Sequence, residues 1–420
     1  MPSFENVAKI VLDKIASDLI ATNTLEIDER NVYTGKTGIA LFLAYYYKYS
    51  QDEKYLEKVY QIMSSALNEI DQEKSISLSG TSGIGWVLQH LTQLGVFSQK
   101  ETQEYLATLN HFVMNSLIYD KQQDNYDLMH GYIGKLIYLI SSHKLSKQPQ
   151  VVTEYILEFI DYFHEKSKKE NDHAIFWTQS NSVINGKINK VCLGLAHGMP
   201  SIISFLCLLL ETFDLPQERK FKASELIQKA CTWILNQRGI YEVKRGVYPT
   251  FIPPDNTQKE GYLAWCYGDL GIAIALTRAG KTIQNKLFYQ EGIKIAVLAA
   301  KRDLITSGIS QDATNFDSTI CHGLFGILYQ FHILYKMTQE PIFKSTVEYW
   351  LNIALDKTDL ELSFCGFQAC ISPRQNTLKE WRDDPTLLGG AAGIGLVLLD
   401  YYFPLIKPPE NWAKILLLDI

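Results

Sequence analysis

The side chains best suited to chemistry stand directly before glycines, at corresponding points of a repeated pattern. Cys266 lies in the sequence WCYG, and Cys321 and His322 lie in CHG. Two thiols and an imidazole can hold a catalytic zinc ion, which typically keeps three protein ligands and one open position. The two cysteines are 55 residues apart, which is not a local metal-binding signature. The alternative is that both are small buried hydrophobic residues.

A second set of residues at the same points could transfer protons. His197 ends the sequence GLAH, and Asp127 and His130 lie in YDLMHG. An imidazole with a pKa of about 6.5 is suited to acid–base catalysis at neutral pH. Two alternatives stay open: His197 as a core histidine bonded to a carbonyl, and Asp127 as a turn or helix-capping residue.

The remaining cysteines give weaker signals. Cys365 and Cys370 lie in CGFQAC, where two thiols could bind a metal, but no histidine is near in the sequence. We therefore favour a bystander role for both. Cys192, Cys207 and Cys231 stand among apolar residues and are predicted to be core residues.

Seven pairs of small residues three positions apart predict the helices that must position these side chains. Successive pairs are separated by 45 to 70 residues. The position after the pair is apolar in six repeats, and the position four further on is apolar in all seven. Each pair should therefore open a strongly apolar helix, with the glycines allowing a tight turn and close packing. The pairs are Gly35/Gly38, Gly80/Gly83, Gly131/Gly134, Gly198/Ser201, Gly268/Gly271, Gly323/Gly326 and Gly390/Gly393.

A more polar, amphipathic stretch precedes each pair. A helix that is apolar all round is buried, whereas one with a single apolar stripe lies outside it. The pattern predicts an all-α fold, an α/α toroid of about fourteen helices, seven inner and seven outer, in a single domain over residues 1–420. An open helical solenoid is the alternative. The amphipathic stretches are roughly 3–21, 52–70, 100–118, 150–168, 218–237, 285–304 and 341–356.

Three longer intervals, near 169–195, 239–262 and 358–386, are rich in Gly, Pro, Asn and aromatic residues and are expected to hold loops or short strands. The turns before the inner helices should all lie at one end of the toroid. The reactive residues of several repeats would then converge around one central mouth.

Composition narrows the function classes. Apolar residues make up 46% of the 420 residues, charged residues 20%, and the net charge is −6, which argues against a nucleic-acid-binding protein. Residues 1–19 read as an amphipathic helix rather than a signal peptide, and no apolar run is long enough to cross a membrane. Seven cysteines without framework spacing then predict reduced thiols in the cytoplasm.

At these motifs the chain resembles the lanthionine synthetase C family, the cyclases of lantibiotic biosynthesis. WCYG, the downstream CHG, GLAHG, the aspartate of YDLMHG and the seven small-residue pairs carry the resemblance over nearly the whole chain. The resemblance implies a toroid with a central Zn²⁺ held by Cys266, Cys321 and His322. It also implies acid–base or positioning roles for His197 and Asp127, and a place near the metal for Tyr267.

One residue departs from the family pattern. Well-known members carry an arginine four residues before the WCYG cysteine, where this chain has Tyr262. A tyrosine has no charge at neutral pH. We expect either a rearranged acid network or another cation in place of the arginine, with Lys259 the nearest in sequence. The alternative is that the position tolerates substitution.

The reaction implied is intramolecular addition of peptide Cys thiols to dehydroalanine or dehydrobutyrine, which forms (methyl)lanthionine rings. The expected partner is a dehydrated lantibiotic precursor peptide. A separate dehydratase and an export transporter would join it in a membrane-associated complex, bringing this cytoplasmic protein to the inner face of the cell membrane. Rival interpretations are prenyl transfer, glycoside hydrolysis, and a zinc-containing scaffold that binds glutathione or a peptide without cyclase activity.

Overall fold

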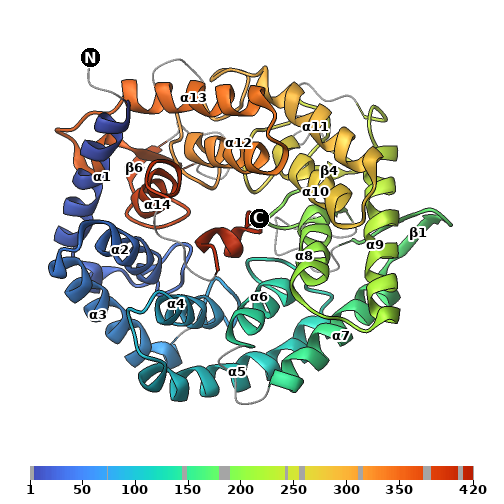
Figure 1. Cartoon of the computed structure of the whole chain (residues 1–420), viewed down its shortest axis with the longest axis horizontal. Helices are drawn as coiled ribbons and strands as arrows, with labels where there is room; N and C mark the ends of the chain where they lie inside the picture. The colour runs from blue at the N-terminus through green and yellow to red at the C-terminus, as the bar shows by residue number, and fades with distance from the viewer. Residues whose placement is uncertain are drawn as a thin grey trace.

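The computed structural model describes residues 4–72, 74–143, 149–178, 190–241, 245–254, 261–310, 316–371, 380–404 and 410–419. Within these residues, fourteen α-helices form two concentric rings (Figure 1). The inner helices are α2 (Lys36–Ser50), α4 (Thr81–Gln93), α6 (Tyr132–Ser142), α8 (Met199–Thr212), α10 (Asp269–Thr282), α12 (Leu324–Thr338) and α14 (Ala391–Tyr402). The outer helices are α1 (Phe4–Ala21), α3 (Glu53–Asn68), α5 (Gln99–Gln122), α7 (Pro149–Lys166), α9 (Gln217–Asn236), α11 (Lys286–Ala300) and α13 (Pro341–Asp356). The predicted α/α toroid is confirmed.

The ring is closed, so the open solenoid is excluded. Each inner helix contacts the next one, and α14 contacts α2 to complete the circle (Figure 1). Several inner helices pack chiefly on the outer helix that follows them in the sequence, as α2 does on α3 and α10 on α11, whereas α6 packs more on the preceding α5. The first helix, α1, therefore packs on the last inner helix, α14, and the two ends of the helical array join.

Burial explains which helices lie inside. In α8 every residue from Met199 to Leu209 is buried. In the outer helix α3 the buried residues form one stripe that includes Tyr55, Val59 and Ile62. The contrast between helices that are apolar all round and helices with one apolar face thus sorts them into the two rings, as predicted.

The glycine pairs allow the preceding loop to fold back over the start of each inner helix. A β-carbon on Gly83 would lie 2.1 Å from the carbonyl oxygen of Leu78, and one on Gly326 would lie 1.9 Å from that of Ile320. No side chain fits at such a distance. The predicted close backbone packing is confirmed, and it brings the loops before the inner helices to one end of the toroid.

Small two-stranded antiparallel sheets occupy the predicted irregular intervals. β1 (Lys168–Asn171) pairs with β2 (Ala174–Phe176), β3 (Val191–Cys192) pairs with β4 (Phe251–Ile252), and β5 (Gln368–Ile371) pairs with β6 (Glu380–Asp383). β3 and β4 join the loops of two successive repeats. The β1–β2 and β5–β6 pairs are local additions to the helical rings.

The C-terminal segment fills the centre of the inner ring. Its 3-10 helix Trp412–Leu416 lies inside the ring (Figure 1). Trp412 is buried and stacks on Tyr329 of α12, with ring centroids 5.1 Å apart. We call residues 410–419 the central plug. Among the described residues, no helix has the length and apolar character required to cross a membrane.

Candidate metal centre

Backbone hydrogen bonds join the loops that precede the inner helices. The amide of Leu388 donates to the carbonyl of Tyr33 at 2.9 Å, and the amide of Cys321 donates to the carbonyl of Leu388 at 3.2 Å. The amide of Trp265 in turn donates to the carbonyl of Cys321 at 3.2 Å. These bonds place the CHG and WCYG loops side by side, although the chain between them spans a full repeat.

The structure brings Cys266, Cys321 and His322 together at this end of the toroid. Their two sulfurs and one imidazole nitrogen all lie within 4.8 Å of one another. The Sγ atoms of Cys266 and Cys321 are 2.9 Å apart, and Cys321 Sγ lies 3.9 Å from His322 Nε2. Cys266 is buried, Cys321 is partly buried and His322 is exposed, so the cluster opens to solvent on one side.

This donor set fits a zinc ion of the catalytic type. Thiolates and imidazoles are preferred zinc ligands, and three of them leave a fourth tetrahedral position for another ligand. Zinc bonded to both sulfurs at about 2.3 Å would hold them about 3.8 Å apart. The sulfurs must therefore separate by about 1 Å relative to the observed 2.9 Å, which small side-chain rotations can supply.

The pKa values of the two thiols are shifted in opposite directions. Burial and the neighbouring Cys321 raise the pKa of Cys266. The hydrogen bond from Cys266 lowers the pKa of Cys321, with the His322 imidazole acting in the same direction. One sulfur of the pair is thus already disposed to be a thiolate, the form that binds metals.

A carboxylate–imidazole pair forms a second cluster in the neighbouring repeats. His197 Nδ1 lies 2.7 Å from Asp127 Oδ2, and both residues are buried. His130 Nδ1 lies 3.4 Å from the other oxygen, Asp127 Oδ1. Burial opposes the charge on Asp127, but the imidazoles of His197 and His130 and the backbone amide of His130 together outweigh burial and lower the pKa of the carboxyl. The pKa of His197 is raised, because the carboxylate of Asp127 outweighs the effect of burial.

The two oxygens of Asp127 have separate tasks. Oδ1 accepts hydrogen bonds from the amides of Met129 at 2.7 Å and His130 at 2.8 Å, which shapes the turn before α6. Asn31 stands at the same point of the first repeat, and its Oδ1 accepts two amides in the same way. The turn therefore needs only an Asx oxygen. The charge of Asp127 is left to act through Oδ2 on His197.

Glycine at position 194 ties the GLAHG loop to the WCYG loop. A β-carbon there would lie 2.0 Å from the carbonyl oxygen of Cys266 and 3.0 Å from Cδ1 of Tyr267. The ring of Tyr267 lies between the two clusters. Its centroid is 5.8 Å from that of His197 and 6.4 Å from that of His322.

The central plug accepts hydrogen bonds from the WCYG loop and from the loop before α2. The indole Nε1 of Trp265 donates to the carbonyl of Leu416 at 3.0 Å, and the hydroxyl of Tyr33 donates to the carbonyl of Ile415 at 2.7 Å. Trp265 is fully buried. The position of Cys266 thus depends on contacts with a segment about 150 residues later in the chain.

Tyr262, the residue that departs from the family pattern, packs on backbone. Gly308 has φ +90°, and a β-carbon on it would lie 2.4 Å from Cδ1 of Tyr262. Lys259, the cation suggested for this position, lies outside the described residues. Asp127 is paired with the imidazoles of His130 and His197. Because Lys259 is not among the described residues, the compensating cation stays a prediction.

Sequence reasoning missed the place of Cys192. It is a buried residue, as predicted, but it packs with Phe251 and Tyr267 beside the site, and its carbonyl oxygen contacts Gly198. Its position six residues before the first glycine of the repeat could have revealed this. Cys365 is buried at α1, where its Sγ lies 3.6 Å from the carbonyl oxygen of Val11. That contact agrees with its interpretation as a bystander.

Two known proteins resemble this chain over most of its length. The chain is 23% identical over 314 residues to a protein named glutathione S-transferase LANCL1 from Danio rerio, covering 74% of this chain and 70% of that protein. The solved structure of a nisin cyclase superposes with a TM-score of 0.66 at 20% identity, covering 98% of this chain and 96% of that chain, and this likeness concerns the fold.

The family comparison covers nearly the whole chain. The family model described as lanthionine synthetase C-like protein matches residues 26–417. That span includes all seven small-residue pairs, both side-chain clusters and most of the central plug. The resemblance stated from the motifs is thereby confirmed, and the chain belongs to the lanthionine synthetase C-like family.

Proposed function

We propose that this protein is a zinc-dependent lanthionine cyclase. It would add Cys thiols of a dehydrated peptide to dehydroalanine or dehydrobutyrine in the same peptide and form (methyl)lanthionine rings. The single observation that carries the proposal is the cluster of Cys266, Cys321 and His322 beside the buried Asp127–His197 pair. Membership of the lanthionine synthetase C-like family supports it.

Cys266, Cys321 and His322 would hold the zinc ion. When bound, zinc lowers the pKa of a substrate thiol and keeps it deprotonated at neutral pH, where a free thiol with a pKa of about 8.5 is mostly protonated. The solvent-exposed side of the cluster, at His322, leaves room for a peptide side chain to approach.

His197 would supply the proton that completes the addition. The substrate sulfur attacks the β-carbon of the dehydro residue, the C=C electron pair moves toward the α-carbon and its carbonyl, and the resulting enolate takes a proton at the α-carbon. The carboxylate of Asp127 raises the pKa of His197, which favours the protonated imidazole that a general acid needs. No atom is lost from the peptide, because the thiol proton is released and one proton is returned.

Asp127 would orient the imidazole of His197 and favour its charged form through the 2.7 Å contact. His130 shares the same carboxylate and is the reserve acid. We assign Tyr267 to the boundary between the clusters, where its ring lies beside both imidazoles and would shape the space for the reacting residues.

The partners follow from this chemistry. The substrate would be a dehydrated lantibiotic precursor peptide, and its dehydration requires a separate dehydratase. We propose a cytoplasmic protein that joins the dehydratase and an export transporter at the inner face of the membrane. No role in nucleic-acid binding is proposed, in keeping with the net charge of −6.

A second candidate rests on the relative from Danio rerio, whose name is glutathione S-transferase LANCL1. The same metal-activated sulfur chemistry would then act on the thiol of glutathione and add it to an electrophile supplied from outside. A scaffold that binds glutathione or a peptide and forms no rings is the non-catalytic version of this candidate.

Purified protein should be incubated with a dehydrated precursor peptide, followed by thiol alkylation and mass spectrometry. Cyclisation leaves the peptide mass unchanged, so it is read as loss of alkylation. The proposal expects fewer alkylated thiols with the wild-type protein and full alkylation with Cys321→Ala. Addition of glutathione to the peptide, without loss of its own thiols, would favour the second candidate.

A further inference from the structure

A groove lies on the outer ring between the end of α3 and the side of α5. Its volume is about 580 Å³, within the range of pockets that bind small molecules. We call it the α5 groove. Its apolar wall is made by Leu67, Ile70, Ile76, Tyr105, Leu109 and Phe112.

The helix that forms one wall carries an aromatic stripe on its solvent-facing side. Tyr105, Phe112 and Tyr119 stand seven residues apart and are 51%, 55% and 62% exposed. Seven residues are about two helical turns, so the three rings follow one face of α5 over about 21 Å. A run of exposed aromatic residues of this kind is typical of an interaction surface.

Two carboxylates stand in this otherwise apolar groove. Asp71 and Glu104 both line it and both are exposed. Within the described part of the chain, neither is paired with a cation. An apolar wall with two acids is complementary to a segment that carries apolar side chains and a lysine or arginine.

The α5 groove adjoins the loop that carries the proposed acid–base residues. Ile76 lines the groove, and Ser79, three residues on, donates its amide to the carbonyl of Met129 at 3.0 Å. Three residues span at most about 10 Å. Met129 stands next to His130 and two residues after Asp127, so the groove lies close to the loop that carries the acid–base residues.

We propose that the α5 groove is a docking site for a part of the substrate peptide that does not react. The bound segment would be rich in apolar residues and would carry at least one basic residue. The inference rests on the proposed function for the identity of the peptide. Its benefit is a higher effective concentration, because a peptide anchored in the groove presents its thiols repeatedly to the same centre.

A binding experiment tests the groove without any ring formation. The probe is a fluorescein-labelled nine-residue peptide of alternating Leu and Lys, with alternating Leu and Glu as the charge control. The wild-type protein should bind the basic probe and discriminate against the acidic one. Tyr105→Ala with Phe112→Ala should weaken binding by about tenfold or more. Because both side chains are exposed, the fold should be retained.

A matched control comes from another outer helix. Phe221 on α9 is 69% exposed and lies outside the groove, so Phe221→Ala should leave binding unchanged. Asp71→Asn with Glu104→Gln should weaken binding and reduce its dependence on salt. Equal binding by the wild type and all groove variants overturns the proposal. So does a dimer of this chain that Phe112→Ala dissociates, because the stripe would then be a self-interface.

A cyclisation assay separates this inference from the proposed function. With a dehydrated precursor, the groove variants should raise KM and leave kcat unchanged, since the site residues are untouched. Rings formed at wild-type KM by every groove variant overturn the docking site and leave the cyclase proposal standing. Binding of the probe in the groove, together with the absence of rings from any precursor, supports a peptide-binding groove and contradicts the cyclase.

Discussion

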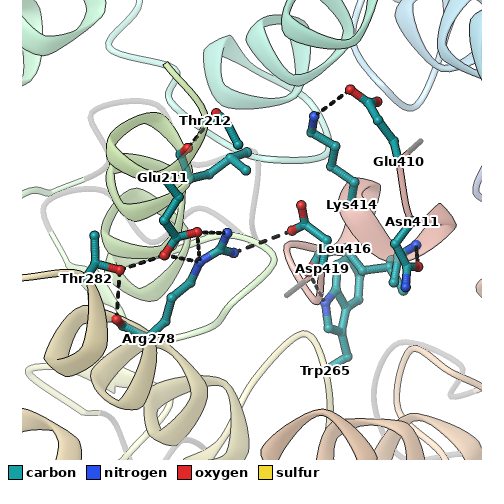
Figure 2. A network of polar contacts seen from close by, with 12 residues as sticks. Glu211, Thr212, Trp265, Arg278, Thr282, Glu410, Asn411, Lys414, Leu416 and Asp419 are labelled. Atoms are coloured by element: carbon teal, nitrogen blue, oxygen red, sulfur yellow. Dashed lines mark hydrogen bonds and ion pairs between the residues drawn. The ribbon is translucent and has the colours of Figure 1, made fainter. Parts of the chain in front are cut away.

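The two ends of the inner ring carry polar groups of different kinds. At the end where the inner helices finish, Arg278 Nη2 lies 2.6 Å from Glu211 and Nη1 lies 3.4 Å from Asp419 of the central plug, as Figure 2 shows. Lys414 and Glu410 pair within the plug at 3.0 Å (Figure 2). At the end where the helices begin, two thiols and one imidazole form one cluster, and two imidazoles and a carboxylate form a second cluster.

This difference assigns stability to the ion-paired end of the ring and chemistry to the end that carries the two clusters. At the other end, where the inner helices finish and which we call the far end, the charges form ion pairs. Those of Arg278 join the central plug to the inner ring. The end where the inner helices begin, which we call the metal end, holds two thiols and an imidazole that could bind a cation. It also holds the imidazole of His197, whose pKa is raised by Asp127. Trp265 connects the two ends, because its indole bonds to the plug while the next residue, Cys266, faces the site.

The largest effect on cyclisation should come from the metal end. Cys266→Ala, Cys321→Ala and His322→Ala should each lose bound zinc and reduce the rate by more than the 10–100-fold typical of residues that only support a ligand. Elemental analysis and circular dichroism check this, with Cys231→Ala as a control for a buried thiol away from the cluster. Retention of about one zinc per chain by Cys321→Ala would contradict the assignment.

His197→Asn should keep the zinc and slow cyclisation by about 10²–10⁴-fold, the usual contribution of a general acid. Single-turnover rates measured by alkylation and mass spectrometry report it. A wild-type rate would transfer the role to His130 or water, and the double variant with His130→Asn decides between them. Loss of zinc from His197→Asn would instead place His197 among the ligands.

Asp127→Asn should move the pH dependence of the rate. Asn31 makes the same turn in the first repeat, so the fold of the loop should survive. The folded-state pKa of His197 is raised by Asp127, so the protonated acid is lost only as the pH rises through that raised value. Without the carboxylate the loss should occur at lower pH, with a rate reduced by about 10–100-fold near neutrality. An unshifted alkaline limb would exclude His197 as the titrating acid.

The far end should affect stability more than rate. Arg278→Met should cost about 2 kcal/mol, less than the 3–5 kcal/mol of a fully buried pair because Glu211 is partly exposed. Denaturant unfolding measures it, with Arg238→Met as the surface-pair control expected near zero. Cyclisation by the folded Arg278→Met protein should stay within about threefold. A large rate loss at unchanged stability would show that the plug controls the chemistry.

The smallest effect is expected at Tyr262. Its ring packs on Gly308, a contact that phenylalanine can also make. Tyr262→Phe should therefore change the cyclisation rate by less than about twofold. A loss of tenfold or more would show that the hydroxyl replaces part of what the family's arginine does.

The inner and outer rings of helices could be predicted from the sequence because both depend on local patterns of residues. Glycine pairs mark the start of each inner helix, and a single apolar stripe marks each outer helix, as α3 and α8 illustrate. The pairing of Cys266 with Cys321 followed from repeat position together with the family motifs. Local patterns therefore predicted the architecture, whereas the family motifs were needed to single out the cluster of Cys266, Cys321 and His322.

Other features depend on contacts that no local pattern contains. Closure of the ring by α1 on α14 joins opposite ends of the chain, and the bond from Trp265 to Leu416 spans 151 residues. Cys192 looks like any buried cysteine until its loop is placed beside Tyr267. The double use of Asp127 appears only when its two oxygens are seen with different partners.

The central claim is that this zinc centre closes thioether rings in a dehydrated peptide. The most direct measurement is thiol alkylation and mass spectrometry of such a peptide after incubation with zinc-loaded and chelator-stripped protein. The account predicts loss of alkylation with unchanged peptide mass for the loaded protein, and full alkylation after stripping, restored by added zinc. Full alkylation with the loaded protein, for a peptide shown to bind it, would contradict the claim.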